Sequence, residues 1–400
     1  MSGHVDLIRS TFNQQIELNW TPSEPSLAIF VGRNGAGKSR LLSQICERHL
    51  QVGRTVLAIS NTAYDKFAHI RGRPRLRLIR GAKGTPEKTL KDAIASGYAG
   101  DDLALRRVSR VLRHCGYLPD IGIEIRYPVG RPPVRRSELL SLEKRIRQDF
   151  EEFLSVAELL TRQELGGKII WFNFDSATPD YSYRSILPRV VRWEKMLKGL
   201  GLIRDVKLHL RSRSAEIPVG AASSGELALI SALAFLATNA SDRVTVLIDE
   251  PENSLHPSWQ REYLELLDDV LRYRQAAVFI ATHSPFLISE ANAKPFNGKN
   301  VAVVVLTSGQ VVPDSRKGET PESLDGVLTE VFQTVTPQSH YLSVSLVSML
   351  NRLESGVSSL AEVHREIAFL RSAGLDSRQA RAVSAVEDMA DQIRELGVPK

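Results

Sequence analysis

The sequence predicts an α/β fold in which helices flank both faces of a mixed sheet. Runs that are mostly apolar, such as 26–31 and 244–248, alternate with stretches whose apolar residues recur at helical spacing. Strands of this kind are typical of sheets that are buried on both faces. Residues 66–215 separate the two groups of strands, so we expect an inserted lobe that splits the core into two halves.

The first half of the core is assigned to residues 1–65. The run SLAIFV at 26–31 predicts a buried strand that leads directly into a glycine-rich loop. The alternation of apolar and polar residues from Lys38 to about Leu50 predicts a helix, and the apolar run at 55–60 predicts a second buried strand.

The inserted lobe, residues 66–215, begins with a basic block. Residues 66–147 contain 20 Lys and Arg against 8 Asp and Glu, although the whole chain has a net charge of only +6. Such a block is typical of a surface that binds a polyanion, but a lobe with salt bridges to acidic neighbours would have the same composition. In an extended segment, alternate side chains share a face. Four of five neighbouring arginines would then lie on one side: Arg71, Arg73, Arg75, Arg77 and Arg80.

The remaining elements are assigned from hydrophobic periodicity. In the lobe we expect helices at 101–115 and 137–166 and strands at 121–127, 168–174 and 206–212. The second half of the core, 216–315, is expected to contain a helix from Ala222, a strand at 244–250, a helix at 258–273 and strands at 276–282 and 300–306. The tail, 316–400, is predicted to be helical, with candidate helices at 343–355, 360–372 and 376–396.

Composition places the chain among ordinary globular proteins, because 42% of its residues are hydrophobic and 24% are charged. Its two cysteines, Cys46 and Cys115, lack the spacing of a zinc site or a disulfide framework. The most apolar run, 301–306, is too short to cross a bilayer, and the first residues do not resemble a signal peptide. We therefore expect a cytoplasmic protein.

A phosphate-binding loop is predicted at GRNGAGKS, residues 32–39. It matches the pattern GxxxxGK[ST], follows a predicted strand and opens a predicted helix. In such loops, backbone N–H groups and the helix N-terminus bind phosphate oxygens. Lys38 is expected to contact the β- and γ-phosphates, and Ser39 to ligate Mg²⁺. The predicted nucleotide contacts in this loop are Asn34, Gly35, Ala36, Gly37, Lys38, Ser39 and Arg40.

Two acids at the end of a strand predict the metal and water side of the same site. The apolar run VLI precedes Asp249 and Glu250. We assign Mg²⁺ binding to Asp249, and orientation or deprotonation of the attacking water to Glu250. His283 follows the next apolar strand, where its imidazole can contact the γ-phosphate. We therefore name Lys38, Glu250 and His283 as candidate catalytic residues.

Four segments together resemble one family. Residues 32–39, ASSGE at 222–226, LIDEPENSLHP at 247–257 and ATHSP at 281–285 are similar to the motifs of ABC-type ATPases, in the branch that contains SMC, RecF and OLD proteins. The resemblance implies a P-loop ABC-type ATPase core that uses ATP and Mg²⁺. It also implies a homodimer or a larger even-numbered homo-oligomer, in which the signature segment of one copy binds the γ-phosphate held by another. The implied signature residues are Ser223, Ser224 and Gly225, and residues 253–256 would cross the interface.

The sequence departs from this family at two places. The family usually has a glutamine after the second strand, whereas this chain reads AISNTAYDKF, so Asn61 or Asp65 would replace it. The aromatic residue that stacks on adenine is not identified by a motif, and Phe12 and Trp20 are both candidates.

The resemblance is closest to the stand-alone ATPases of bacterial antiphage systems, such as the Septu type. There the ATPase works with a separate effector, a nuclease, and the same division of labour is implied for this chain. The tail helices would then serve as a docking surface or pack as a cap on the core. The alternatives are a RecF-like ATPase that acts directly on DNA through the basic lobe, the ATPase subunit of a transporter, and a nucleotide-gated scaffold.

Overall fold

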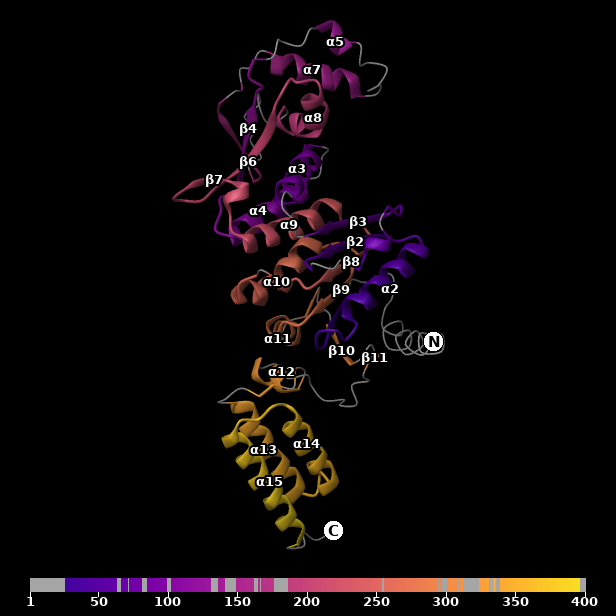
Figure 1. Ribbon diagram of the computed structural model, residues 1–400, viewed down its shortest axis with the longest axis vertical. Coiled ribbons are helices and arrows are strands. Elements are labelled where there is room, and N and C mark those ends of the chain that lie inside the picture. Colours follow the sequence, from indigo (N-terminus) through magenta and orange to yellow (C-terminus); the bar gives the residue numbers. More distant parts are fainter. Residues whose placement is uncertain are drawn as a thin grey trace. The chain divides into compact units, whose positions relative to one another are not determined.

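The structure is a computed structural model, shown in Figure 1. It describes residues 26–62, 66–70, 72–80, 85–98, 102–130, 136–140, 149–161, 165, 167–175, 186–253, 255–293, 295–296, 301–307, 310–311, 324–330, 332, 334–335 and 339–395. The candidate residues Phe12, Trp20, Asp65, Arg71 and Ser254 lie outside these ranges. The chain forms two compact units: residues 1–45, 257–264 and 277–400 make up the first, and residues 46–256 and 265–276 the second.

Parallel strands support the phosphate loop in the first unit. β1 (Ser26–Val31) lies between β9 (Ala277–Thr282) and β10 (Ala302–Thr307), parallel to both, and β11 (Gln310–Val311) runs antiparallel to β10. Phe30 and Phe279 stack across β1 and β9, with ring centroids 6.1 Å apart. All of β9 is buried, as expected for a parallel strand whose residues are apolar up to its final threonine. The strands predicted at 26–31, 276–282 and 300–306 are confirmed.

The helices of the first unit are in part those that the sequence predicted. α2 (Lys38–Gln51) starts at the phosphate loop as predicted, and its residues up to Ile45 belong to this unit. α11 (Pro285–Ala293) follows β9 and was not predicted, and α12 (Leu324–Glu330) is the first described helix of the tail. The tail forms a bundle of α13 (His340–Glu354), α14 (Leu360–Ser372) and α15 (Ser377–Glu395), which lie against one another (Figure 1). Its core includes Leu346, Ile367 and Val383. The three predicted tail helices are confirmed, and no described helix of the chain is long and apolar enough to span a bilayer.

Three parallel strands carry the acid pair in the second unit. β2 (Thr55–Ser60) lies between β8 (Val244–Asp249) and β3 (Leu76–Arg80). β8 is buried at every position, whereas β3 is partly exposed because it pairs with β2 on one side only. Residues 76–80 fall in the range that the sequence assigned to the inserted lobe, but they extend the strands of the core. Leucine and arginine alternate in this segment, as they do in surface segments. For this reason the sequence did not predict a core strand here.

The predicted row of arginines on one face does not form. β3 begins only at Leu76, and Arg75 has a left-handed backbone with φ of 69°, so side chains do not alternate through this region. Arg75 donates a hydrogen bond to the carbonyl of Gly53, and Arg77 donates one to the side chain of Asn239. These two guanidinium groups therefore make contacts within the unit.

The inserted lobe contains an antiparallel sheet with the order β5-β4-β6-β7. Its strands are β4 (Asp120–Arg126), β5 (Ile169–Asn173), β6 (Asp205–Arg211) and β7 (Glu216–Pro218). β6 alternates buried and half-buried residues, the pattern of a sheet with one face in the core. The helices that accompany the lobe are α3 (Thr85–Tyr98), α4 (Asp102–His114), α5 (Arg136–Leu140), α7 (Phe150–Thr161) and α8 (Leu187–Gly199). The helix predicted at 137–166 is confirmed only over α5 and α7, because residues 141–148 lie outside the described ranges.

α9 (Ser224–Asn239) is the central helix of the second unit. Its residues 229–237 are all buried, consistent with a helix that is apolar around its whole circumference. α3 and α4 both pack against it, so the inserted lobe is in direct contact with the helix that carries the signature segment at its N-terminus. α10 (Pro257–Leu271) completes the described helices.

Candidate nucleotide site

The phosphate loop leaves the carboxyl end of β1 in the first unit. A Cβ on Gly32 would lie 2.5 Å from the carbonyl oxygen of Leu306, so only glycine fits there. Gly35 and Gly37 have φ of 83° and 94°, values that favour glycine over any other residue. Between them, Ala36 donates its N–H to the carbonyl of Arg33 at 3.0 Å. The glycines predicted from the motif are therefore required by the backbone of this loop.

Lys38 is almost completely buried, with 5% of its surface exposed. Its ammonium donates to the carbonyl of Gly32 at 2.8 Å and lies 3.4 Å from that of Arg33. The side chain thus folds back over the loop, where a phosphate group could replace the carbonyl contacts. Asn34, Gly35 and Arg40 are exposed, and Ser39 is half-buried in the first turn of α2.

His283 lies at the same edge of the strands as the phosphate loop. Val31 at the end of β1 is paired with Thr282 at the end of β9, so Gly32 and His283 leave neighbouring strands side by side. His283 is exposed, whereas Ser284 is buried and donates from its hydroxyl to Gln260 at 2.6 Å. The predicted proximity of His283 to the loop follows from this register.

The acid pair lies at the carboxyl end of β8 in the second unit. Asp249 is fully buried and is paired with Ser60 at the end of β2. The N–H of Asn61 donates to the carbonyl of Asp249 at 3.2 Å. Glu250 is half-buried and has a left-handed backbone with φ of 51°, which is unusual outside glycine and marks a constrained turn.

Two asparagines hold this turn together. The side chain of Asn253 donates to Oε2 of Glu250 at 2.8 Å and to the carbonyl of Asn61 at 3.3 Å. The side chain of Asn61 in turn donates to the carbonyl of Glu250 at 3.4 Å. Of the two candidates for the missing glutamine, Asn61 lies beside Glu250, and Asp65 is outside the described residues. The family resemblance assigns Asn253 only to the interface loop, whereas its i, i+3 spacing from Glu250 is the local signal for this contact.

The signature segment forms the N-terminus of α9. Ser223 is the N-cap: its hydroxyl accepts from the N–H of Glu226 at 3.2 Å, and its own N–H donates to Oε2 of Glu226 at 2.8 Å. This reciprocal arrangement is a capping box. Ser223 and Ser224 are exposed and Gly225 is buried. The hydroxyl of Tyr117 also donates to Oε2 of Glu226, at 2.8 Å, a contact that no sequence motif predicted.

The candidate residues match the chemistry of a magnesium nucleotide. The glycine loop offers backbone N–H groups and one ammonium for the phosphates. Ser39 and Asp249 offer hard oxygen atoms, the donors that Mg²⁺ prefers in combination with phosphate oxygens and water. The residues in the first unit are Asn34–Arg40 and His283, and those in the second unit are Ser223–Gly225, Asp249 and Glu250.

Comparison with known proteins finds similarity over part of the chain. Residues 131–289 match a family model described as "AAA domain, putative AbiEii toxin, Type IV TA system". A curated relative, the ea59 protein of Escherichia phage lambda, is 34% identical over 134 residues. That alignment covers 32% of this chain and 24% of ea59, so the match spans about a quarter of the phage protein.

Solved structures with similarity to the chain include an ABC transporter and an Smc head domain. An ABC transporter of the metal-chelate type, in an inward-facing conformation, is 16% identical, and the alignment covers 78% of each chain with a TM-score of 0.28. The Smc head domain of Pyrococcus furiosus, bound to the C-terminal domain of ScpA, is 10% identical. There the alignment covers 72% of this chain and 89% of the other, with a TM-score of 0.29.

Proposed function

We propose that this chain is an ATP-hydrolysing subunit that dimerises around ATP and regulates a separate effector, a nuclease, in bacterial antiphage defence. The main observation that supports an ATP-dependent dimer is the position of the signature serines. Ser223 and Ser224 are exposed at the N-terminus of a helix whose residues 229–237 are all buried, so a second copy can present a phosphate to them. Helix N-termini stabilise anions through their N–H groups and dipole.

Each site residue has a role in this proposal. Lys38 and the glycine loop would bind the phosphates, and Ser39 and Asp249 would hold the magnesium ion that neutralises their charge. Glu250 would orient the attacking water and accept its proton, with its carboxylate held by Asn253. His283 would donate a hydrogen bond to the γ-phosphate. A homodimer, or a larger even-numbered oligomer, would contain two such sites.

A protein effector is favoured over DNA as the partner of the lobe, because many lobe arginines already have acidic partners. Arg110 lies 3.3 Å from Asp269, and Arg192 lies 2.8 Å from Asp149. Arg113 and Arg211 pair with Asp175 and Asp120. The pairs of Arg110 and Arg113 fit the alternative explanation of the basic block, in which part of its charge is balanced within the protein. The family description, which names a toxin of a toxin–antitoxin system, also supports a role in defence.

The proposed dimer is tested with a variant that binds ATP but hydrolyses it slowly, so that the ATP-bound dimer accumulates. Glu250→Gln should bind ATP and hydrolyse it at least about 100-fold more slowly, since the group that activates water is lost. Size-exclusion chromatography with light scattering should then show a dimer with ATP and a monomer without it. The double variant Lys38→Ala/Glu250→Gln is the control and should stay monomeric. An unchanged mass of Glu250→Gln at saturating ATP would reject the ATP-driven dimer.

The partner is tested separately. The trapped dimer is used as bait in the presence of ATP, and co-purification of a nuclease that is absent with Lys38→Ala would support the effector. Direct DNA binding is measured by a salt titration, because contacts to phosphates give an affinity that falls steeply with salt concentration. Tight, salt-dependent binding without a protein partner would favour the RecF-like alternative instead.

A further inference from the structure

The hydroxyl of Tyr117 connects the inserted lobe to the signature helix. Tyr117 is mostly buried, and it follows the C-terminus of α4. Its N–H donates to the carbonyl of Leu112 at 2.9 Å, and Gly116 before it has φ of 83°, the geometry of a glycine-capped helix end. The next residue, Leu118, donates its N–H to the carbonyl of Arg211 in β6 at 2.7 Å. Tyr117 is therefore anchored to α4 on one side and to the lobe sheet on the other.

Oε2 of Glu226 receives two donors that come from different parts of the chain. One is the N–H of Ser223, within the capping box, and the other is the hydroxyl of Tyr117, each at 2.8 Å. A carboxylate oxygen with two donors has a defined orientation, so its negative charge stays on the capped side of the helix. Burial, together with the hydrogen bond and the charge of Glu226, raises the pKa of Tyr117 above its ordinary value, so its hydroxyl remains a donor.

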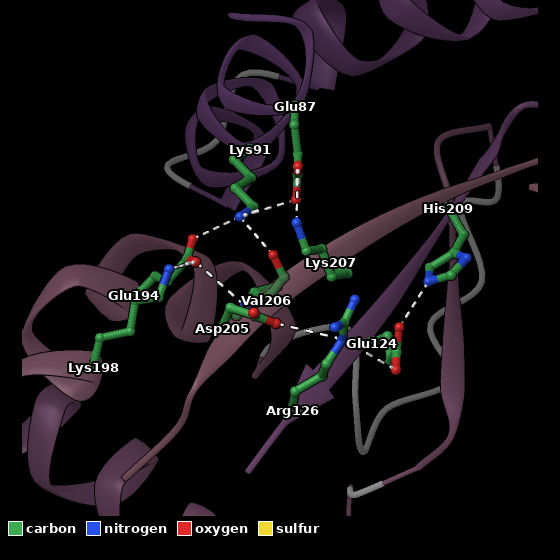
Figure 2. Close-up of polar contacts among 10 residues, drawn as sticks. All are labelled: Glu87, Lys91, Glu124, Arg126, Glu194, Lys198, Asp205, Val206, Lys207 and His209. Carbon is green, nitrogen blue, oxygen red and sulfur yellow. Dashed lines mark hydrogen bonds and ion pairs between the residues drawn. The ribbon is translucent and has the colours of Figure 1, made fainter. Parts of the chain in front are cut away.

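Ion pairs and hydrogen bonds connect the elements of the lobe to one another. They stabilise the part of the chain from which Tyr117 contacts Glu226. Figure 2 shows Lys91 of α3 between α8 and β6: its ammonium contacts Glu194 at 2.8 Å and the carbonyl of Val206 at 2.6 Å. Glu194 also accepts from the N–H of Val206 at 3.2 Å. Lys207 in β6 lies 3.8 Å from Glu87 of α3. Since α3 also packs on α9, a displacement of the lobe sheet would also displace the signature helix.

We infer that Tyr117 is a positioning residue for the signature segment, through which the lobe sets how well Ser223–Gly225 bind the ATP of a second copy. Without its hydroxyl, the carboxylate of Glu226 can rotate toward the incoming phosphate and repel it. The lobe thus controls dimerisation without contacting nucleotide. This inference rests on the proposed ATP-driven dimer.

The test uses Tyr117→Phe, which removes only the hydroxyl, in the full-length Glu250→Gln protein. We expect the ATP-dependent dimer to dissociate about fivefold more readily, the size expected for one lost hydrogen bond. The affinity of the monomer for a fluorescent ATP analogue should not change. Tyr127→Phe is the matched control, because it removes the same hydroxyl near the other end of β4 and should leave dimerisation unaltered. Adding Glu226→Gln should suppress the effect of Tyr117→Phe, because the repelling charge is gone.

A second measurement does not depend on the dimer. Hydrogen exchange of the nucleotide-free protein should speed up at the amides of Ser223 and Glu226 in Tyr117→Phe and stay unchanged in Tyr127→Phe. The inference is overturned if Glu250→Gln dimerises with ATP and Tyr117→Phe alters neither dimerisation nor this exchange. It is also overturned if nucleotide affinity falls as much as dimerisation, because the effect would then be a general loss of structure. A Glu250→Gln protein that binds ATP and stays monomeric would reject the proposed dimer itself.

Discussion

Two helices of this protein begin with the same four-residue pattern, and only one of them lies in a predicted functional motif. In α9 the N–H of Ser223 donates to Glu226 at 2.8 Å, and in α14 the N–H of Ser359 donates to Glu362 at the same distance. The reciprocal N–H contacts to the serine hydroxyls are 3.2 and 3.4 Å. The two capping boxes are thus locally equivalent.

They differ in what surrounds the carboxylate. Glu226 is half-buried, and its carboxylate accepts a second hydrogen bond from Tyr117, which comes from the inserted lobe. Glu362 is exposed, and its additional contact is internal, with the hydroxyl of its own Ser359 at 3.1 Å. The pattern S-x-x-E thus specifies a helix start, whereas a tertiary contact decides whether a distant part of the chain can position that start. The α14 box therefore serves as an internal control for the α9 box.

The largest expected difference comes from adding a negative charge to each first turn. Ser224→Glu should keep α9 folded, because a carboxylate is favourable near a helix N-terminus. It should nevertheless weaken the ATP-dependent dimer by about 100-fold or more, since it would face a phosphate at close range. Ala361→Glu places the same charge in the first turn of α14, at an exposed position, and should not affect the dimer. Analytical ultracentrifugation of both variants in the Glu250→Gln background measures the difference. If the two variants dimerised equally, the proposal that α9 lies in the dimer interface would be rejected.

A smaller difference is expected when the caps are removed. Ser359→Ala should lower the local stability of α14 by about 1 kcal/mol, the usual loss for an N-cap serine, and leave ATP hydrolysis unchanged. Ser223→Ala should lower the local stability of α9 by a similar amount. It should also reduce ATP hydrolysis, because Ser223 both caps the helix and, in the proposed dimer, binds the phosphate. Hydrogen exchange at the first turns reports the stability, and steady-state kinetics reports the hydrolysis. A loss of hydrolysis in Ser359→Ala as large as in Ser223→Ala would contradict the comparison.

The two capping boxes also illustrate which features of the site the sequence could predict and which it could not. Helix starts near Ala222 and at Leu360 follow from local patterns, and the glycines of the phosphate loop follow from a contiguous motif. Tyr117 is separated from Glu226 by 109 positions, and Asn61 from Glu250 by 189, so no local spacing connects them. β3 was missed for a similar reason: its leucines and arginines alternate like a surface segment, and only its pairing with β2 reveals a core strand. Backbone-defined features were thus predictable, while contacts between distant side chains were not.

The smallest expected effect is a dependence of the α14 box on pH. Hydrogen bonds from the N–H and the hydroxyl of Ser359 lower the pKa of Glu362 below its ordinary value of 4.5. A lowered pKa means that the folded helix binds fewer protons than the unfolded chain, so this stabilisation is complete above about pH 4.5 and is lost as the pH falls through the lowered pKa. Glu362→Gln retains an amide oxygen as acceptor and cannot titrate. Protection of the α14 first turn from hydrogen exchange, corrected for the intrinsic rate, should fall as the pH is lowered from above 4.5 through the lowered pKa of Glu362 in the natural protein, and change less in Glu362→Gln. An identical fall in both would show that Glu362 does not stabilise this turn through its charge.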